Sequence, residues 1–152
     1  MNRELFLKVE EWFRRSVGKF DFEDMDQVLD KSARIVEKVL SSDALSREIH
    51  KVRILMRMLS DYRKGEYTQV PWNSVAAIGV ALLYILIPID LIPDVIPVVG
   101  FTDDLAMLLF VWKMILRDVE EYVRWKCSRD MVDSSFRELV LNIFGEELCS
   151  GP

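Results

Sequence analysis

Apolar residues recur at intervals of three and four positions through the first 69 residues, with charged residues between them. This spacing places the apolar side chains along one face of a helix, as in amphipathic helices that pack against a core. We predict one helix that ends near Gly18, a second over 23–40, and a third that begins near Leu45 and ends at Lys64. The run at 41–43, Ser-Ser-Asp, supplies a break and an N-cap between the last two. No segment shows the alternating pattern of a strand.

The segment from Val75 to Ile87 has a different pattern, because it is apolar on every side. A helix without a polar face must be buried in protein or in lipid. Its thirteen residues would span roughly 20 Å, which is less than the roughly 30 Å of a bilayer core. The length therefore favours a buried core helix or a re-entrant helix that enters a membrane without crossing it. Trp72, Tyr84 and Trp112 would be core residues in the first case and interfacial anchors in the second.

A hydrophobic segment with three prolines follows this helix. Pro88, Pro93 and Pro97 prevent a continuous helix, while most of the residues between them are apolar. We predict that Thr102 caps the next helix and that this helix occupies 105–125. Its first half is apolar and its second half is charged, so the helix would pass from an apolar environment into water.

The remainder of the chain predicts one more amphipathic helix, over 131–144, which Gly145 closes. We therefore predict an all-α fold, a bundle of about six helices around a hydrophobic, proline-interrupted helical hairpin. The 152 residues form a single domain in this prediction. It consists of three amphipathic helices over 1–69, the hairpin over 70–126 and a C-terminal amphipathic helix over 127–148.

The charge distribution separates the hairpin from the rest of the chain. The formal net charge is −5, yet residues 70–116 contain one Lys/Arg and four Asp/Glu, whereas 1–69 contain 14 and 13. No segment has the excess of basic residues that would neutralise a phosphate backbone, so nucleic-acid binding is not expected. Cys127, Cys149 and His50 are not at ligand spacing, and we expect neither a zinc site nor a disulfide.

Basic residues flank the hairpin on both sides. Arg63 and Lys64 precede its first helix, and Lys113 and Arg117 lie in its second. If the hairpin enters a membrane, this bias predicts that both flanks are cytoplasmic. The proline segment would then lie within or beyond the lipid.

The proline segment carries a longer motif. The sequence is Leu-Ile-Pro-Ile-Asp-Leu-Ile-Pro-Asp over 86–94, and it continues with Ile-Pro at 96–97, Gly at 100 and Asp-Asp-Leu at 103–105. This pattern resembles the signature of the YkvA family, a widespread domain of unknown function, and it covers about a third of the chain. The resemblance implies a small membrane-associated protein and no established chemistry. The motif residues are Pro88, Asp90, Pro93, Asp94, Pro97, Gly100, Asp103 and Asp104.

The aspartates of the motif are the only acids among residues 70–116. They are Asp90, Asp94, Asp103 and Asp104. Carboxylates in apolar surroundings are costly unless they are paired, cap a helix or bind a cation. In one interpretation each of them caps a helix. In a second, two or more bind Mg²⁺ or Ca²⁺, which prefer oxygen ligands, and in a third they contact a basic partner or basic residues of the other helices.

We predict a non-catalytic helical protein that is membrane-associated through the 70–116 hairpin and presents the aspartate segment to a protein partner or a cation. No cofactor is required in this hypothesis, and the oligomeric state is left open. One alternative is a soluble, cytoplasmic interaction module in which the hairpin is buried core. Another is a metal-dependent hydrolase that uses the four aspartates, although the pattern lacks a general acid and a general base.

Overall fold

Every secondary-structure element in the described part of the chain is a helix. The computed structural model describes residues 3–86, 100–129, 132–145 and 148, with the backbone alone at 5, 6, 9 and 100–104. The helices in these ranges are α1 (Arg3–Lys19), α2 (Phe22–Asp30), α3 (Ser32–Leu40), α4 (Asp43–Ser46), α5 (Ile49–Arg63), α6 (Trp72–Leu86), α7 (Gly100–Ser128) and α8 (Ser134–Phe144). The predicted all-α fold class is therefore confirmed.

The chain is divided into more helices than the apolar pattern predicts. The helix expected over 23–40 is two helices, α2 and α3, which meet at Lys31. The backbone N–H of Lys31 bonds back to the carbonyls of Gln27 and Leu29, which closes α2. This turn contains neither glycine nor proline, the usual sequence marks of a break. The turn allows each of the two short helices to bury its own pair of apolar residues.

Two of the predicted helix ends are confirmed by their hydrogen bonds. The hydroxyl of Ser42 caps α4 and accepts a hydrogen bond from the N–H of Leu45 at 3.2 Å. α4 is a separate short helix before α5, so the third predicted helix is also divided. After α8, Gly145 adopts a φ of 67° and donates its N–H to the carbonyl of Leu141. Glycine adopts this left-handed conformation without the steric cost that a side chain would bring.

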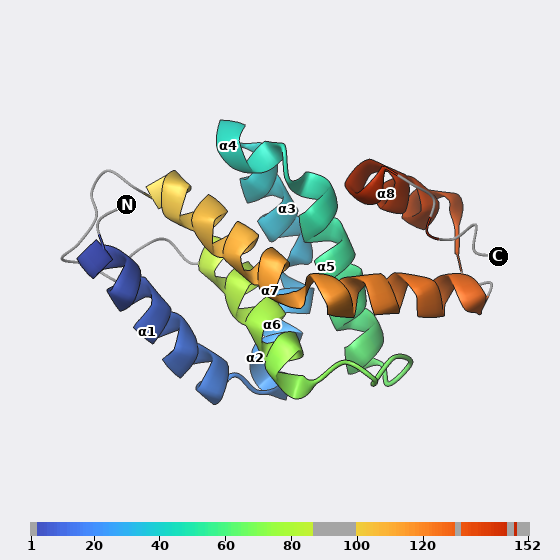
Figure 1. Ribbon diagram of the computed structural model, residues 1–152, viewed down its shortest axis with the longest axis horizontal. Coiled ribbons are helices and arrows are strands. Elements are labelled where there is room, and N and C mark those ends of the chain that lie inside the picture. Colours follow the sequence, from blue (N-terminus) through green and yellow to red (C-terminus); the bar gives the residue numbers. More distant parts are fainter. Residues whose placement is uncertain (1–2, 87–99, 130–131, 146–147, 149–152) are drawn as a thin grey trace.

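α7 begins at Gly100, so the prediction that Thr102 caps a helix starting at Leu105 is wrong. The chain from Gly100 onward contains no proline within this helix, and nothing prevents a helical backbone there. Asp103 and Asp104 consequently lie in the first two turns of α7, where the positive end of the helix dipole favours negative charge. Figure 1 shows that α7 changes direction near its middle, so that its two halves pack against different neighbours.

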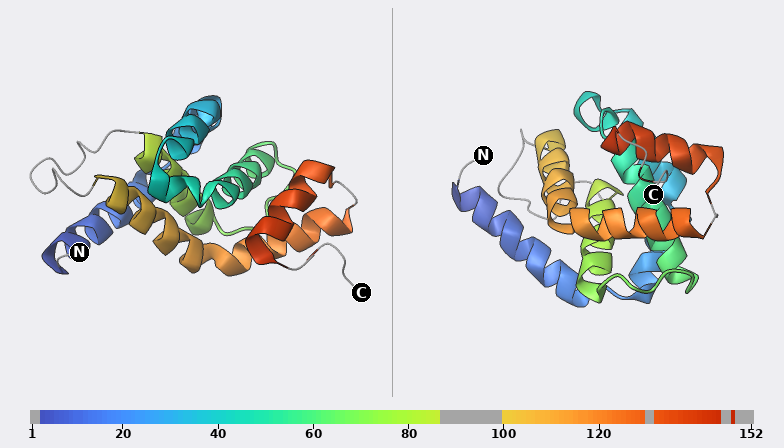
Figure 2. Two further views of the ribbon diagram at one scale, coloured as in Figure 1. Left: turned by 90° about the horizontal axis from the view of Figure 1, so that it is seen from above. Right: turned by 45° about the vertical axis from the view of Figure 1, so that its right-hand side comes forward.

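α6 is the central helix of the fold. It contacts α1, α2, α3, α5 and α7, and these helices surround it in Figures 1 and 2. The first half of α7 returns along α6, while α8 packs on α5 at the side of the molecule away from α1. The core is therefore built around the first helix of the predicted hairpin.

Candidate functional site

The predicted aspartate site lies largely outside the described residues. Outside them are Pro88, Asp90, Pro93, Asp94 and Pro97. Gly100, Asp103 and Asp104 lie at the start of α7, where the backbone alone is described. Among the side chains that the structure describes, no group of three or more His, Cys, Asp or Glu residues could hold a metal ion. A Mg²⁺ or Ca²⁺ site at the four aspartates stays a prediction.

The apolar helix that precedes the proline segment is buried in protein. From Val75 to Ile85 every residue except Leu83 is buried, and the buried apolar side chains are at most 3% exposed. The ring of Phe20 lies directly against Gly79, where an added Cβ would be 2.0 Å from the Phe20 Cζ atom. The absence of a side chain at this glycine allows the ring to approach the helix backbone. Of the two alternatives for this helix, the structure shows the buried core helix.

The aromatic residues that were candidate interfacial anchors also pack in the core. Tyr84 is 1% exposed and Trp112 is 8% exposed. The rings of Trp12 and Tyr84 lie 5.1 Å apart between centroids, and Lys51 Nζ lies 5.6 Å from the centroid of Trp112. Trp72 is half-buried and packs against aromatic rings of α2 and α5. Tyr84 and Trp112 are therefore core residues, and Trp72 lies at the edge of the core.

Polar contacts fix both ends of α6. Lys38 Nζ donates a hydrogen bond of 3.3 Å to the carbonyl of Leu86, the last residue of α6. The last carbonyls of a helix lack intrahelical partners and carry partial negative charge, so an ammonium group there is stabilising. At the other end, the Ser74 hydroxyl donates to the Asp118 carboxylate of α7 at 2.6 Å. These contacts set the point at which the chain leaves α6 and the alignment of α7 beside it.

The first half of α7 has an apolar side that protein covers only in part, where the Phe110 ring meets the Phe13 ring of α1 at 5.7 Å between centroids. Leu109, Phe110 and Met114 on this side are 38%, 42% and 51% exposed, whereas the opposite side of the same turns is buried. Lys113 and Arg117 are exposed on the same side of the helix. These five residues form the outer face of α7.

The second half of α7 is joined to α5 by a buried polar network. Asp61 of α5 accepts hydrogen bonds from the Tyr122 hydroxyl at 2.5 Å and from Lys126 Nζ at 2.7 Å. Asp61 and Lys126 are 6% and 9% exposed, and Tyr122 is fully buried. Burial and the hydrogen bond to Asp61 raise the pKa of the Tyr122 hydroxyl far above its usual range. Because the three groups satisfy one another, the network is a structural contact between two helices.

The sequence contains a signal for this network that a search for apolar stripes misses. Asp61 follows Ile54 by seven positions and Met58 by three, and both of these residues are buried. The three therefore share one face of α5. Tyr122 and Lys126 are four positions apart and share a face of α7 in the same way. An acid and a base on otherwise buried faces of two helices indicate that they pair, because each would be costly to bury alone.

Cys127, near the end of α7, is disulfide-bonded. The expectation that the chain contains no disulfide is therefore wrong at this residue. Disulfide formation depends on Cα atoms approaching within roughly 4.4–6.8 Å in the fold. Separation along the sequence does not reveal that distance. Cys149 lies outside the described residues.

The geometry defines a class of protein: a small all-helical protein in which the apolar helix α6 is buried among its neighbours and the first half of α7 packs beside it. The family described as a protein of unknown function (DUF1232) matches residues 74–110. The uncharacterized membrane protein YkvA of Bacillus subtilis (strain 168) is 36% identical over 78 residues, which are 51% of this chain and 74% of the relative. The chain belongs to this YkvA-like family of unknown function. No solved structure matches it.

The family match covers the hairpin and leaves out the buried network. Residues 74–110 include most of α6, the proline segment and the first turns of α7. Asp61, Tyr122 and Lys126 all lie outside this range. Within the helices that the structure describes, none is both long enough and apolar enough to cross a membrane. The part of the chain that the family model matches thus contains one buried helix and the partly exposed beginning of another.

Proposed function

We propose that this protein attaches to the surface of a membrane through the outer face of α7 and the apolar residues of the proline segment. The observation that carries the proposal is the exposure of Leu109, Phe110 and Met114 on one side of α7. Helices that lie in a membrane interface present such an apolar face with Lys or Arg beside it. Lys113 and Arg117 supply that positive charge, because their stems can lie on apolar surface while their charged ends reach the headgroups.

The free energy available from the outer face alone is modest. Complete burial of a Leu, Phe or Met side chain contributes about 1.5–3 kcal/mol, so three that are roughly half exposed would contribute about 3 kcal/mol in total. A single myristoyl chain gives only marginal, reversible binding. The proposal therefore includes the apolar residues between the two helices, which are Ile89, Leu91, Ile92, Val95, Ile96, Val98 and Val99.

The burial of α6 supports a shallow attachment. Five other helices contact α6, so its apolar surface is already covered by protein. α6 ends at Leu86 and α7 begins at Gly100 on the same side of the molecule (Figures 1 and 2). Only that side would meet the lipid, and the basic flanks of the hairpin would stay on the cytoplasmic side.

The comparison with the relative supports the same location. The name of the Bacillus subtilis protein describes it as a membrane protein. The family match over 74–110 includes Leu109, Phe110 and the whole proline segment. These are the parts of the chain that the proposal places in contact with lipid.

We further propose that the aspartate segment presents its carboxylates to a divalent cation or a basic partner at the membrane surface. Asp90, Asp94, Asp103 and Asp104 would repel one another and anionic lipid unless a positive group neutralised them. Mg²⁺ and Ca²⁺ accept carboxylate and carbonyl oxygens as ligands. Titration of each metal into the full-length chain, with Asp90→Asn/Asp94→Asn as the variant, should show binding that the variant loses. Unchanged metal binding by the variant would refute this role.

Sedimentation of the full-length chain with vesicles of phosphatidylcholine and phosphatidylserine tests the membrane proposal. We expect the wild-type protein to bind. The variant Leu109→Gln/Phe110→Gln/Met114→Gln should lose roughly a hundredfold in its partition coefficient, because about 3 kcal/mol of lipid contact is removed. The matched control Leu40→Gln/Leu141→Gln replaces exposed leucines of α3 and α8 and should bind as the wild type does.

Different failures of this experiment have different meanings. Absence of wild-type binding by a folded protein would refute the membrane proposal and favour a soluble helical interaction module, which the burial of α6 also permits. Equal losses in the variant and the control would show that binding does not depend on the outer face. In cells, alkaline carbonate should release the protein from membranes, and retention after that wash would contradict a shallow attachment.

A further inference from the structure

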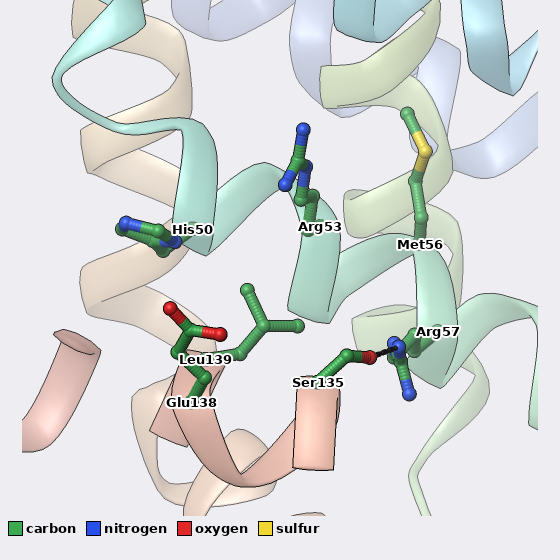
Figure 3. A pocket seen from close by; sticks show the side chains of 7 residues that line it. All are labelled: His50, Arg53, Met56, Arg57, Ser135, Glu138 and Leu139. Carbon is green, nitrogen blue, oxygen red and sulfur yellow. Dashed lines mark hydrogen bonds between the residues drawn. The ribbon is translucent and has the colours of Figure 1, made fainter. Parts of the chain in front are cut away.

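A cavity of about 300 Å³ lies between α5 and α8, at the side of the molecule away from α1. Figure 3 shows that α5 contributes His50, Arg53 and Arg57 to its wall, and that α8 contributes Ser135 and Glu138. These residues lie outside the family match, the outer face of α7 and the buried network. The cavity is therefore a separate feature of this chain.

One wall of the cavity is fixed by contacts between the two helices. Arg57 donates a hydrogen bond of 2.5 Å from Nη2 to the Ser135 hydroxyl, and its Nη1 lies 3.7 Å from Asp133 Oδ1. Its guanidinium group also lies over the Phe136 ring, 5.6 Å from the centroid. Asp133 in turn caps α8 by accepting a hydrogen bond of 2.7 Å from the N–H of Phe136. Arg57 thus serves to position α8, and its donors are largely engaged.

Three other polar groups of the cavity have no such engagement. Within the described part of the chain, Arg53 makes no hydrogen bond or ion pair, and neither does the carboxylate of Glu138. The Nδ1 atom of His50 is buried and has no hydrogen-bond partner there. In Figure 3 the Glu138 side chain extends from α8 toward the side of the cavity where His50 lies. A buried nitrogen without a partner costs free energy that a ligand can recover.

Two apolar residues also line the cavity. Met56 and Leu139 line it and are 8% and 6% exposed. The cavity therefore combines an unpaired cation, an unpaired anion and an imidazole above a small apolar surface. In the sites of small molecules, polar groups placed in this way fix the orientation of the ligand.

We propose that this cavity binds a small zwitterionic molecule that carries an ammonium group and an anionic group, as an α-amino acid does. The anionic group would accept hydrogen bonds from Arg53, and the ammonium group would donate to Glu138 and to Nδ1 of His50. A simple anion would be repelled by Glu138, and a simple cation would be repelled by Arg53. A short aliphatic side chain would lie on Met56 and Leu139.

The chain supplies its own reporter for this site. His50 is the only histidine in the sequence, so its imidazole gives a single set of signals in an NMR spectrum of the full-length protein. Leucine is the first probe, because it carries both charges and an aliphatic side chain. 4-Methylpentanoate lacks the ammonium group and isopentylamine lacks the carboxylate, so these two molecules test whether both charges are needed. Glycerophosphoethanolamine and vesicles of phosphatidylethanolamine each carry one negative and one positive charge per molecule, and they separate a free ligand from a lipid headgroup.

Two substitutions test the charged groups separately. Arg53→Met and Glu138→Gln change exposed side chains, and each should weaken leucine binding roughly tenfold or more through the loss of a hydrogen bond to a charged group. The matched controls Arg34→Met and Glu37→Gln change exposed residues of α3 and should leave the affinity unchanged. Circular dichroism of all four variants checks that the helices are intact.

The expected result is a saturable shift of the His50 signals with a zwitterion and a much smaller shift with either single-charge analogue. A response to leucine or glycerophosphoethanolamine in solution identifies a free ligand, whereas a response to the vesicles alone identifies a lipid headgroup. Absence of a response to all three zwitterionic probes would overturn the proposal. An equal response to 4-methylpentanoate or to isopentylamine, or unchanged affinity in both Arg53→Met and Glu138→Gln, would overturn it as well.

Discussion

α6 and the first half of α7 have similarly apolar sequences and different surroundings. α6 is covered by five other helices, whereas the first half of α7 is covered on its inner side and leaves Leu109, Phe110 and Met114 exposed. Hydrophobicity along the sequence therefore shows that a segment avoids water, and the number of neighbouring helices decides whether protein covers it. The larger exposed apolar surface of the two helices therefore belongs to α7.

The two halves of α7 are attached to the rest of the molecule in different ways. The second half is attached to α5 through the three-residue network of Asp61, Tyr122 and Lys126, whereas the first half is attached through apolar packing. Polar contacts of this kind specify one position for a helix, because any other position would leave a buried charge unpaired. α7 therefore has one half that is fixed in place and another half that presents a surface. The substitutions below test each of these assignments.

Asp61→Ala should have the largest effect on stability. It leaves the ammonium group of Lys126 and the hydroxyl of Tyr122 buried without their partner, and we expect the free energy of unfolding to fall by about 3–5 kcal/mol. Chemical denaturation measures this change. The triple variant Asp61→Leu/Tyr122→Phe/Lys126→Met should recover most of the loss, because apolar replacement of a whole buried ion pair costs little. If Asp61→Ala unfolded at the same denaturant concentration as the wild type, the network would not be buried.

Gly79→Leu tests the close packing of α6. The new side chain would overlap the Phe20 ring, and overpacking of this kind lowers the free energy of unfolding by about 1–3 kcal/mol. The matched control is Gly18→Ala in α1, where no atom lies within 4 Å of an added Cβ. That control should stabilise the protein by about 0.5–1 kcal/mol, because alanine is the better helix former. Destabilisation of equal size in both variants would contradict the difference in packing.

Tyr122 makes the stability of this network sensitive to alkaline pH. Its pKa is raised in the folded protein by burial and by the hydrogen bond to Asp61, so the folded state keeps the proton when the unfolded state loses it above about pH 10. The contribution of Tyr122 should be complete below about pH 10 and decrease above it by up to about 1.4 kcal/mol per pH unit. The free energies of unfolding of wild type and Tyr122→Phe, measured by chemical denaturation, should therefore converge as the pH rises. A constant difference between the two proteins at all pH values would contradict the raised pKa.

Met114→Gln should have the smallest effect on stability, although it changes the proposed membrane contact. Met114 is 51% exposed, and a surface substitution usually changes the free energy of unfolding by no more than about 0.5 kcal/mol. The matched control is Met107→Gln, seven positions earlier and 4% exposed. Burial of an amide there should cost about 2 kcal/mol or more. Similar free energies of unfolding for the two variants would contradict the difference in burial between the inner and outer sides of α7.

Much of this fold follows from local sequence patterns. The all-round apolar segment predicted over 75–87 is α6, and the expected signals at Ser42 and Gly145 cap α4 and α8 as predicted. The second predicted helix is divided at Lys31, where the sequence has no glycine or proline to mark a break. This division depends on how α2 and α3 pack against the core. Local patterns show where a helix is favourable, and they do not show where packing requires it to turn.

Less of the candidate site than of the fold could be predicted from the sequence. The network around Asp61 joins residues 61 and 65 positions apart in the sequence, and a search for apolar periodicity treats such residues as surface. The exposure of Leu109 and Phe110 depends on which helices pack beside α7, which no local pattern records. The roles of the motif aspartates, Asp90 and Asp94 among them, stay predictions because those residues lie outside the described part of the chain.

The central position of α6 has a consequence for the synthesis of the chain. The helices that cover α6 come partly from the chain before it, α1, α2, α3 and α5, and partly from α7 after it. While α7 is still inside the ribosome, one side of α6 lacks its cover, and transiently exposed apolar surface is prone to aggregation and is what chaperones protect. The interval between the emergence of α6 and that of α7 is therefore the time at which the nascent chain is most exposed to aggregation.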